Sequence, residues 1–193
     1  MIYIDSKKKS TKTLEKLYPN ALLIDVTSKS ESQWVKLSPF YPHGDIPVPN
    51  SDGITATCVE AIWQGLKVFQ YTDIDTTLFY NETMKNLKRT VRRYGFPKGH
   101  RYGINSNEIL SYIDARKKIY IPSYNWVLQN KVYSMIQNLV EQAKSKDIVL
   151  LDYETNCDVD DGSKPLSHAS LIKKFIEENF QLKKPEYKQL SLF

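Results

Sequence analysis

The sequence has few of the residues that mark specialised protein classes. Only two of its 193 residues are cysteines, Cys58 and Cys157, which excludes a framework of disulfides. The three histidines (His43, His100 and His168) are scattered, so we expect no metal site and no cofactor. No run approaches the roughly 18 apolar residues of a membrane span, and the opening segment MIYIDSKKKS lacks the apolar core of a secretory signal. We therefore expect a cytoplasmic protein without a membrane segment.

The composition is that of an ordinary soluble globular protein. The chain is 41% hydrophobic and 25% charged, and its length fits one domain. Its 27 Lys and Arg against 22 Asp and Glu give a net charge of +5, which admits a nucleic acid or phosphate partner but does not establish one. The 13 tyrosines serve equally as stacking surfaces or as core residues.

Hydrophobic patterns predict an α+β fold, a helix-rich single domain with a small sheet. Residues 2–4, 21–26 (ALLIDV) and 148–153 (IVLLDY) read as strands, and the proline-rich loop 37–53 holds at most an edge strand. We expect the domain to span residues 1–180, followed by a tail over 181–193. Helices are expected over residues 11–17, 57–71, 75–95, 105–118, 122–144 and 167–179.

Glu60, Gln64 and Lys67 form the only polar stripe of the helix expected at 58–70. Every other position up to Phe69 is apolar or small, so this helix should be largely buried. One interpretation is a Glu–Lys pair on a narrow solvent-exposed strip. The other is a polar ligand pocket beside Trp63, which the combination of carboxylate, amide and amine favours.

Two motifs resemble the NADAR/YbiA-like superfamily of N-glycosidases. They are LSPFYP at 37–42 and EAIWQGLK at 60–67, similar to an aromatic loop followed by a helix Glu-His-x-x-Gln-x-x-Lys. Members cleave the bond between base and ribose in a nucleotide-like riboflavin precursor, or remove ADP-ribose from guanine in nucleic acid. A weaker similarity extends to residue 178, through Trp126, Lys131 and an acidic segment after residue 153.

The sequence departs from the superfamily pattern at two positions. Ala61 stands where members have His, and Asp161 stands where they have Trp before Gly162. Residues 2–26 have no counterpart in the pattern. An altered substrate or a loss of activity therefore stays open.

The resemblance implies roles for individual residues, since glycosidic hydrolysis needs a carboxylate beside an oxocarbenium-like transition state. Glu60 is the first candidate, with Lys67 as a phosphate or ribose anchor or a transient covalent partner. Gln64 is expected to bind a ribose hydroxyl or base edge. Asp158 is the candidate second carboxylate, alongside Glu154 and Asp160, unless this loop is a solvated turn. Phe40, Tyr41 and Trp63 are candidates for stacking on the substrate, or for packing.

Residues 83–107 carry seven Lys and Arg and no acid, whereas residues 147–161 carry six acids and no Lys or Arg. The first segment is expected to contact phosphates, of a polynucleotide or of an ADP-ribose pyrophosphate, with Lys85, Lys88, Arg89 and Arg92 on one helical face. Arg93 and Arg101 are two further candidates for phosphate contact, and Lys98 is the seventh basic residue.

The last five residues, QLSLF, resemble the peptide that binds the bacterial sliding clamp. Leu190, Leu192 and Phe193 would be apolar anchors, and Gln189 would add directional hydrogen bonds. The resemblance implies a bacterial or phage protein that works near DNA. The alternative is a tail that packs on its own domain.

Together these features predict an N-glycosidase that removes ADP-ribose or a related group from guanine in DNA near the replication fork. Two alternatives stay open. One is a non-catalytic clamp-binding adaptor or inhibitor with a nucleotide-sensing pocket, and the other is a glycosidase of a free nucleotide metabolite.

Overall fold

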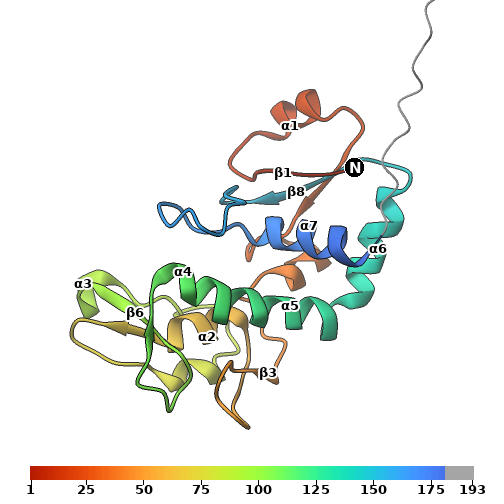
Figure 1. The fold of residues 1–193 in the computed structure, drawn as a ribbon. Coiled ribbons are helices and arrows are strands. Elements are labelled where there is room, and N and C mark those ends of the chain that lie inside the picture. Colours follow the sequence, from red (N-terminus) through yellow and green to blue (C-terminus); the bar gives the residue numbers. More distant parts are fainter. Residues whose placement is uncertain (181–193) are drawn as a thin grey trace, which may run out of the picture.

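Three parallel strands from distant parts of the chain form the central sheet of the computed structural model, which describes residues 1–180 (Figure 1). Strand β8 (Ile148–Asp152) lies between β1 (Ile2–Ser6) and β2 (Leu22–Asp25). Ile148 is in register with both Ile2 and Leu22. All five β8 residues are buried, as a central parallel strand requires, which confirms the strands predicted from the apolar runs.

Helices cover both faces of this sheet because successive β8 side chains point to opposite sides. Val149 and Leu151 pack against Leu14 of α1 (Thr11–Leu17). Ile148 and Leu150 belong to the main core, which also contains the buried residues of α7 (His168–Asn179). Ser167 caps α7 through its side chain, as predicted.

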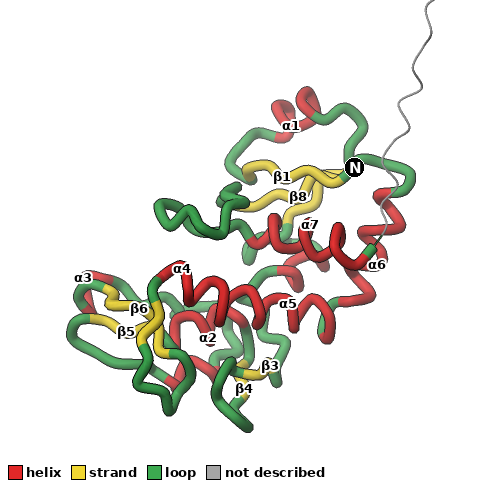
Figure 2. Tube along the Cα trace, in the orientation of Figure 1, coloured by secondary structure: helices red, strands yellow, loops and turns green. Residues whose placement is uncertain are grey.

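The rest of the domain is a helix-rich assembly with two further small antiparallel sheets (Figure 2). The expected α+β class is thus observed, with three small sheets in place of one. Its elements are η1 (Gln33–Leu37), β3 (Ile46–Pro47), β4 (Thr55–Ala56), α2 (Val59–Gly65), β5 (Lys67–Phe69), η2 (Thr76–Tyr80), α3 (Val91–Tyr94), β6 (Pro97–Arg101), β7 (Ile109–Leu110), α4 (Tyr112–Ala115), η3 (Arg116–Tyr120), α5 (Ile121–Asn130) and α6 (Tyr133–Ala143).

The helix predicted over residues 57–71 is shorter than expected. It ends at Gly65, and Lys67–Phe69 is a strand that pairs with β6. Gly65 lies against the Phe79 ring, with no space there for a Cβ atom. The N-cap of α2 is Cys58, whose sulfur accepts a hydrogen bond from the Ala61 N–H at 3.3 Å.

The prediction of a helix over residues 75–95 was wrong. Only η2 and α3 form there, and Met84 and Asn86 have positive φ angles of 59° and 58°, which a helix does not accommodate. The basic residues of this segment therefore do not share one helical face. Similarly, the predicted helix 105–118 is replaced by β7, α4 and the π-helical turn η3, and the predicted helix 122–144 divides into α5 and α6.

Along residues 1–180, no helix combines the length and apolar character that crossing a membrane requires.

Candidate functional site

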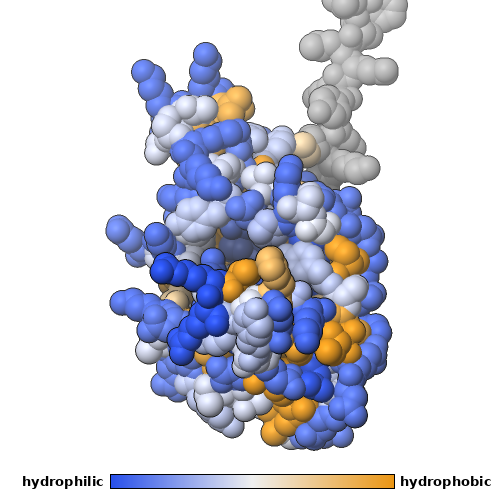
Figure 3. All heavy atoms as spheres, turned by 90° about the vertical axis from the view of Figure 1, so that its left-hand side faces the viewer, coloured by the Kyte–Doolittle hydropathy of each residue, from blue (hydrophilic) through white to orange (hydrophobic). Residues whose placement is uncertain are grey.

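A cavity of about 420 Å³ opens at the carboxyl ends of β2 and β8, between the parallel sheet and the α2–β5 region. Ligands of open parallel sheets commonly bind at this edge, and the volume suits a small molecule. Figure 3 looks onto this side of the molecule and shows a hollow between its upper and lower halves. The cavity is lined by Thr27, Ser28, Ser38, Pro39, Phe40, Glu60, Trp63, Gln64, Lys67, Lys88, Arg89, Thr90, Tyr112, Arg116, Tyr120, Asp152, Tyr153, Glu154, Pro165, Leu166 and His168.

Glu60 is a buried carboxylate in the cavity wall. Its side chain accepts a hydrogen bond from Gln64 Nε2 at 2.9 Å, one helical turn along α2. Its backbone N–H donates to the Pro39 carbonyl at 2.9 Å, which fixes the 37–42 loop against the helix. Burial raises the pKa of Glu60, and the Gln64 hydrogen bond and the nearby Lys88 and Lys67 charges offset only part of that effect.

Two lysines bring positive charge to the same cavity. Lys67 enters from β5, and burial lowers its pKa, whereas the Glu60 charge raises it. Lys88 comes from the irregular segment before α3, with its Nζ 5.9 Å from the centre of the Phe40 ring. Within residues 1–180, neither lysine makes a salt bridge, so both ammonium groups remain available for an anionic ligand.

Arg89 is a structural member of the wall. Its guanidinium donates to the carbonyls of Lys67 at 2.6 Å and Asp73 at 2.7 Å, and its backbone N–H donates to Gln64 Oε1 at 3.2 Å. The Gln64 amide is thus held from both ends, by Arg89 and by Glu60. Gln64 consequently orients the Glu60 carboxylate.

Asp152 and His168 form a buried pair that the sequence analysis missed. Asp152 Oδ2 lies 2.9 Å from His168 Nδ1 and accepts from Ser167 Oγ at 2.8 Å. His168 Nε2 lies 2.8 Å from the Val26 carbonyl, which only accepts, so both ring nitrogens carry protons. Burial alone would lower the pKa of His168, but its hydrogen bonds and the Asp152 charge raise it overall. Burial alone would raise the pKa of Asp152, but the hydrogen bond with His168 is the chief factor that lowers it overall. The sequence feature that could have indicated Asp152 is a carboxylate at the end of a buried apolar strand.

Aromatic residues form the remaining wall. Tyr120 lines the cavity together with Glu60 and Asp152. Burial raises the pKa of Tyr120 well above its ordinary value, and the Glu60 and Asp152 charges add to that rise. Trp63 meets Tyr112 and Tyr120 edge-on, with ring centres 5.7 and 5.5 Å apart. On its other side Trp63 stacks on His100 at 3.7 Å.

Arg116 connects this wall to the acidic loop after β8. Its guanidinium donates to the carbonyls of Val159 at 3.1 Å and Asp161 at 2.7 Å, and also to that of Lys164. The side chain is 2% exposed, so it acts as an internal brace that orders the loop. No feature of the sequence singled out this arginine.

The structure brings together one part of the predicted site and leaves another part outside it. Eight predicted residues line the cavity: Phe40, Glu60, Trp63, Gln64, Lys67, Lys88, Arg89 and Glu154. Seven others do not: Tyr41, Lys85, Arg92, Arg93, Arg101, Asp158 and Asp160. Arg101 pairs with Asp73, and Asp160 pairs with Lys117 at 2.5 Å on the surface. Gln189, Leu190, Leu192 and Phe193, with the predicted tail from residue 181, lie outside the described residues.

The model of a family of unknown function, DUF6939, matches residues 6–172. The chain belongs to DUF6939. The matched range contains every cavity-lining residue, since these run from Thr27 to His168. No curated protein matches the sequence.

The chemistry available to this DUF6939 cavity follows from its side chains. It offers a buried carboxyl group with a raised pKa, two ammonium groups and a wall of aromatic rings. Such a set suits proton transfer beside an anionic, aromatic ligand. Across residues 1–180, no cluster of three His, Cys, Asp or Glu side chains has a geometry that would hold a metal ion.

Proposed function

We propose that this DUF6939 protein is an N-glycosidase that hydrolyses the bond between a nucleobase and ribose or ADP-ribose, with a fold of the NADAR/YbiA-like type. The observation that carries the proposal is the convergence of Glu60, Gln64 and Lys67 on one cavity, although Lys67 lies on a strand and not on the helix. These are the residues on which the resemblance to that superfamily rests.

The reaction consumes one water molecule. Its oxygen bonds to the ribose C1′ as a hydroxyl group, the C1′–N bond breaks, and its other proton ends on the nitrogen of the leaving base. Glu60 stands beside the positive charge that develops on the ribose and exchanges the proton, a role that a raised pKa favours in a carboxyl group. Lys67 and Lys88 bind the phosphates, and the aromatic wall contacts the base. Glu154 replaces Asp158 as the second carboxylate, because Glu154 lines the cavity.

The preferred substrate is ADP-ribosylated guanine in DNA. Purified protein is incubated with an oligonucleotide that carries this modification, and released ADP-ribose is measured by mass spectrometry. Glu60→Gln should lower the rate at least about 100-fold with the fold unchanged by circular dichroism. The matched control is Glu141→Gln on α6, an exposed position remote from the cavity lining, which should leave the rate unchanged. Absence of release from modified DNA, modified RNA and free nucleotides by the folded protein would refute the enzymatic proposal.

A second candidate function is supported by Ala61. This residue is fully buried and occupies the position where the superfamily pattern has His, so the imidazole of that pattern is missing here. Under this alternative the cavity binds a nucleotide without turnover. Isothermal titration with the modified oligonucleotide, together with mass spectrometry of the same mixture, separates the two functions, since the second predicts binding of the oligonucleotide by the wild type without release of any product.

We further propose that residues 189–193 bind the bacterial sliding clamp and bring the protein to replicating DNA. The support is the sequence QLSLF alone, with its apolar anchors and directional glutamine. Immobilised clamp should retain the full chain and should not retain a chain lacking residues 189–193. A chain whose last five residues are scrambled serves as the control, and its retention would argue against the peptide.

A further inference from the structure

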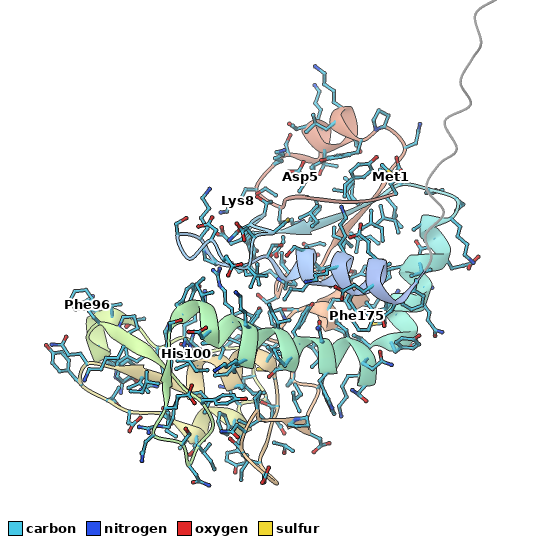
Figure 4. All side chains as sticks on the ribbon, in the orientation of Figure 1. Met1, Asp5, Lys8, Phe96, His100 and Phe175 are labelled. Atoms are coloured by element: carbon cyan, nitrogen blue, oxygen red, sulfur yellow. The ribbon has the colours of Figure 1, made fainter. Side chains whose placement is uncertain are left out.

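Two aromatic side chains are largely exposed at the end of the β5–β6 strand pair where β5 ends and β6 begins. Tyr71 is 74% exposed and Phe96 is 73% exposed. Their backbones are tied together, because Gln70 N–H donates to the Phe96 carbonyl at 2.8 Å and Tyr71 N–H donates to the Tyr94 carbonyl at 3.1 Å. Figure 4 labels Phe96 at the extremity of the lower half of the domain, pointing away from it.

The support beneath these rings is well packed. A Cβ atom on Gly95, which has a φ of 79°, would lie 2.9 Å from the Tyr71 ring, so that ring rests directly on the glycine backbone. One layer below, the Arg89 guanidinium lies 4.9 Å from the ring centres of both Phe69 and Tyr94. This end of the β5–β6 pair, called the platform below, is therefore well supported, and its exposed aromatic surface is typical of a binding site.

Basic side chains flank the platform, and the nearby carboxylate of Asp73, two residues after Tyr71, is already paired with Arg101. Arg92, Arg93 and Lys98 are exposed on α3 and β6, within the segment 83–107 that has no acid. Throughout residues 1–180, none of these three side chains has a salt-bridge partner. In Figure 3 strongly hydrophilic side chains gather along the lower edge of the hollow. Uncompensated charge of one sign attracts a polyanion.

The platform is continuous with the cavity. Lys88, Arg89 and Thr90 line the cavity, and α3 begins at the next residue, Val91. Only a few residues of the protein chain therefore separate the platform from the cavity lining, so a long ligand bound on the platform can extend to the cavity mouth.

We propose that Tyr71 and Phe96 stack on unpaired bases of a single-stranded nucleic acid, while Arg92, Arg93 and Lys98 contact its phosphates. Aromatic faces next to free basic side chains are the combination that binds single strands, and paired bases would not offer their faces. The strand then runs from the platform to the cavity, where one modified base enters. This last step, which makes the substrate a polynucleotide, rests on the proposed N-glycosidase function, whereas strand binding does not.

Fluorescence anisotropy with labelled 12-nucleotide oligo(dT) and oligo(U), and with a duplex of equal length, tests the proposal. The wild type should prefer the single strands. The double variant Tyr71→Ala/Phe96→Ala should bind them at least about 10-fold more weakly, and Tyr71→Trp/Phe96→Trp should retain binding. Arg92→Ala/Arg93→Ala should reduce the slope of log K against log salt by about 1.4, the loss of two phosphate contacts. Lys144→Ala/Lys146→Ala, at the far end of α6, is the charge-matched control and should bind as the wild type does.

Unchanged affinity of the alanine double variant, or a preference for the duplex, would refute strand binding at the platform.

Strand binding and the N-glycosidase function can be refuted independently of each other. Strand binding by a wild type that releases nothing from any substrate removes the glycosidase and leaves the platform. Turnover of free nucleotides by a protein that binds no strand removes the platform and leaves the glycosidase.

Discussion

His168 and Asp152 form an imidazolium–carboxylate pair in the cavity wall, with Nδ1 and Oδ2 2.9 Å apart. Asp152 ends the central strand β8 and His168 begins α7, so the pair joins the sheet to the helix that covers it. Both side chains are nearly buried, which makes each the main compensation for the charge of the other.

The stability that this pair contributes should depend on pH in a defined window. The pKa of His168 is raised above 6.5, so its contribution is complete below pH 6.5 and declines as the pH rises through the folded-state value. The pKa of Asp152 is lowered below 3.8, so its contribution is complete above pH 3.8 and declines under more acidic conditions. Asp152→Asn should therefore lower the free energy of unfolding by about 3–5 kcal/mol between these limits, and by less at pH 9. Urea unfolding at several pH values measures this, and an equal loss at pH 5 and pH 9 would contradict it.

Gln64 should tune the acidity of Glu60. Its Nε2 donates to the Glu60 carboxylate and so favours the charged form. In Gln64→Met the pKa of Glu60 should rise, and the limb of the pH–rate profile that Glu60 controls should move to higher pH. Carboxyl titration by NMR gives the same readout without turnover. Gln70→Met, at an exposed position outside the cavity lining, is the matched control, and a Glu60 pKa that is the same in all three proteins would exclude this role.

Arg89 should matter for folding more than for ligand binding. Its guanidinium donates to the carbonyls of Gln64, Lys67 and Asp73, which are otherwise hard to satisfy in this buried turn. Arg89→Ala should cost on the order of 3 kcal/mol of unfolding free energy, and Arg89→Lys should also destabilise, because an ammonium does not reproduce the planar fork. Arg92→Ala, exposed on α3, should stay within about 0.5 kcal/mol of the wild type. Equal effects of Arg89→Ala and Arg92→Ala would reject this division of roles.

The sequence pattern predicted those parts of the fold that local residue order determines. The apolar runs of β2 and β8 and the Ser167 cap of α7 were identified correctly, since strand burial and capping leave local signatures. Lys67 was assigned to a helix because its spacing from Glu60 suits one, whereas pairing with β6, some 30 residues away, makes it a strand. Lys67 still reaches the cavity because Val68 and Phe69 fix the strand against the core.

The cavity residues that were missed come from long-range packing. Arg116 appears unremarkable in sequence, and only the fold reveals that it binds the carbonyls of the 159–164 loop. Conversely, Arg89 looked like a surface phosphate ligand, because nothing in a basic run tells which member turns inward. Tyr120 joins the site through η3, an irregular turn that no periodicity indicated.

His100 should make the protein sensitive to acid. It stacks on Trp63, is 1% exposed, and neither ring nitrogen has a hydrogen-bond partner within residues 1–180. Burial, with a smaller effect of the Lys67 charge, lowers its pKa from 6.5 to about 3. The unfolded chain therefore binds a proton below pH 6.5 that the folded chain rejects, which favours unfolding by up to about 1.4 kcal/mol for each pH unit.

His100→Phe keeps the stacked ring and removes the proton site, so its stability at pH 7 should match or exceed that of the wild type. As the pH falls from 6.5 toward 3, the advantage of the variant should grow, because only the wild type must exclude a proton from this position. The trend is separable from that of the Asp152–His168 pair, whose contribution is constant over most of this range. Urea unfolding of both proteins at pH 7, 6, 5 and 4 measures the difference. Parallel curves would mean that His100 is protonated in the fold, and hence that a polar group or water reaches it behind Trp63.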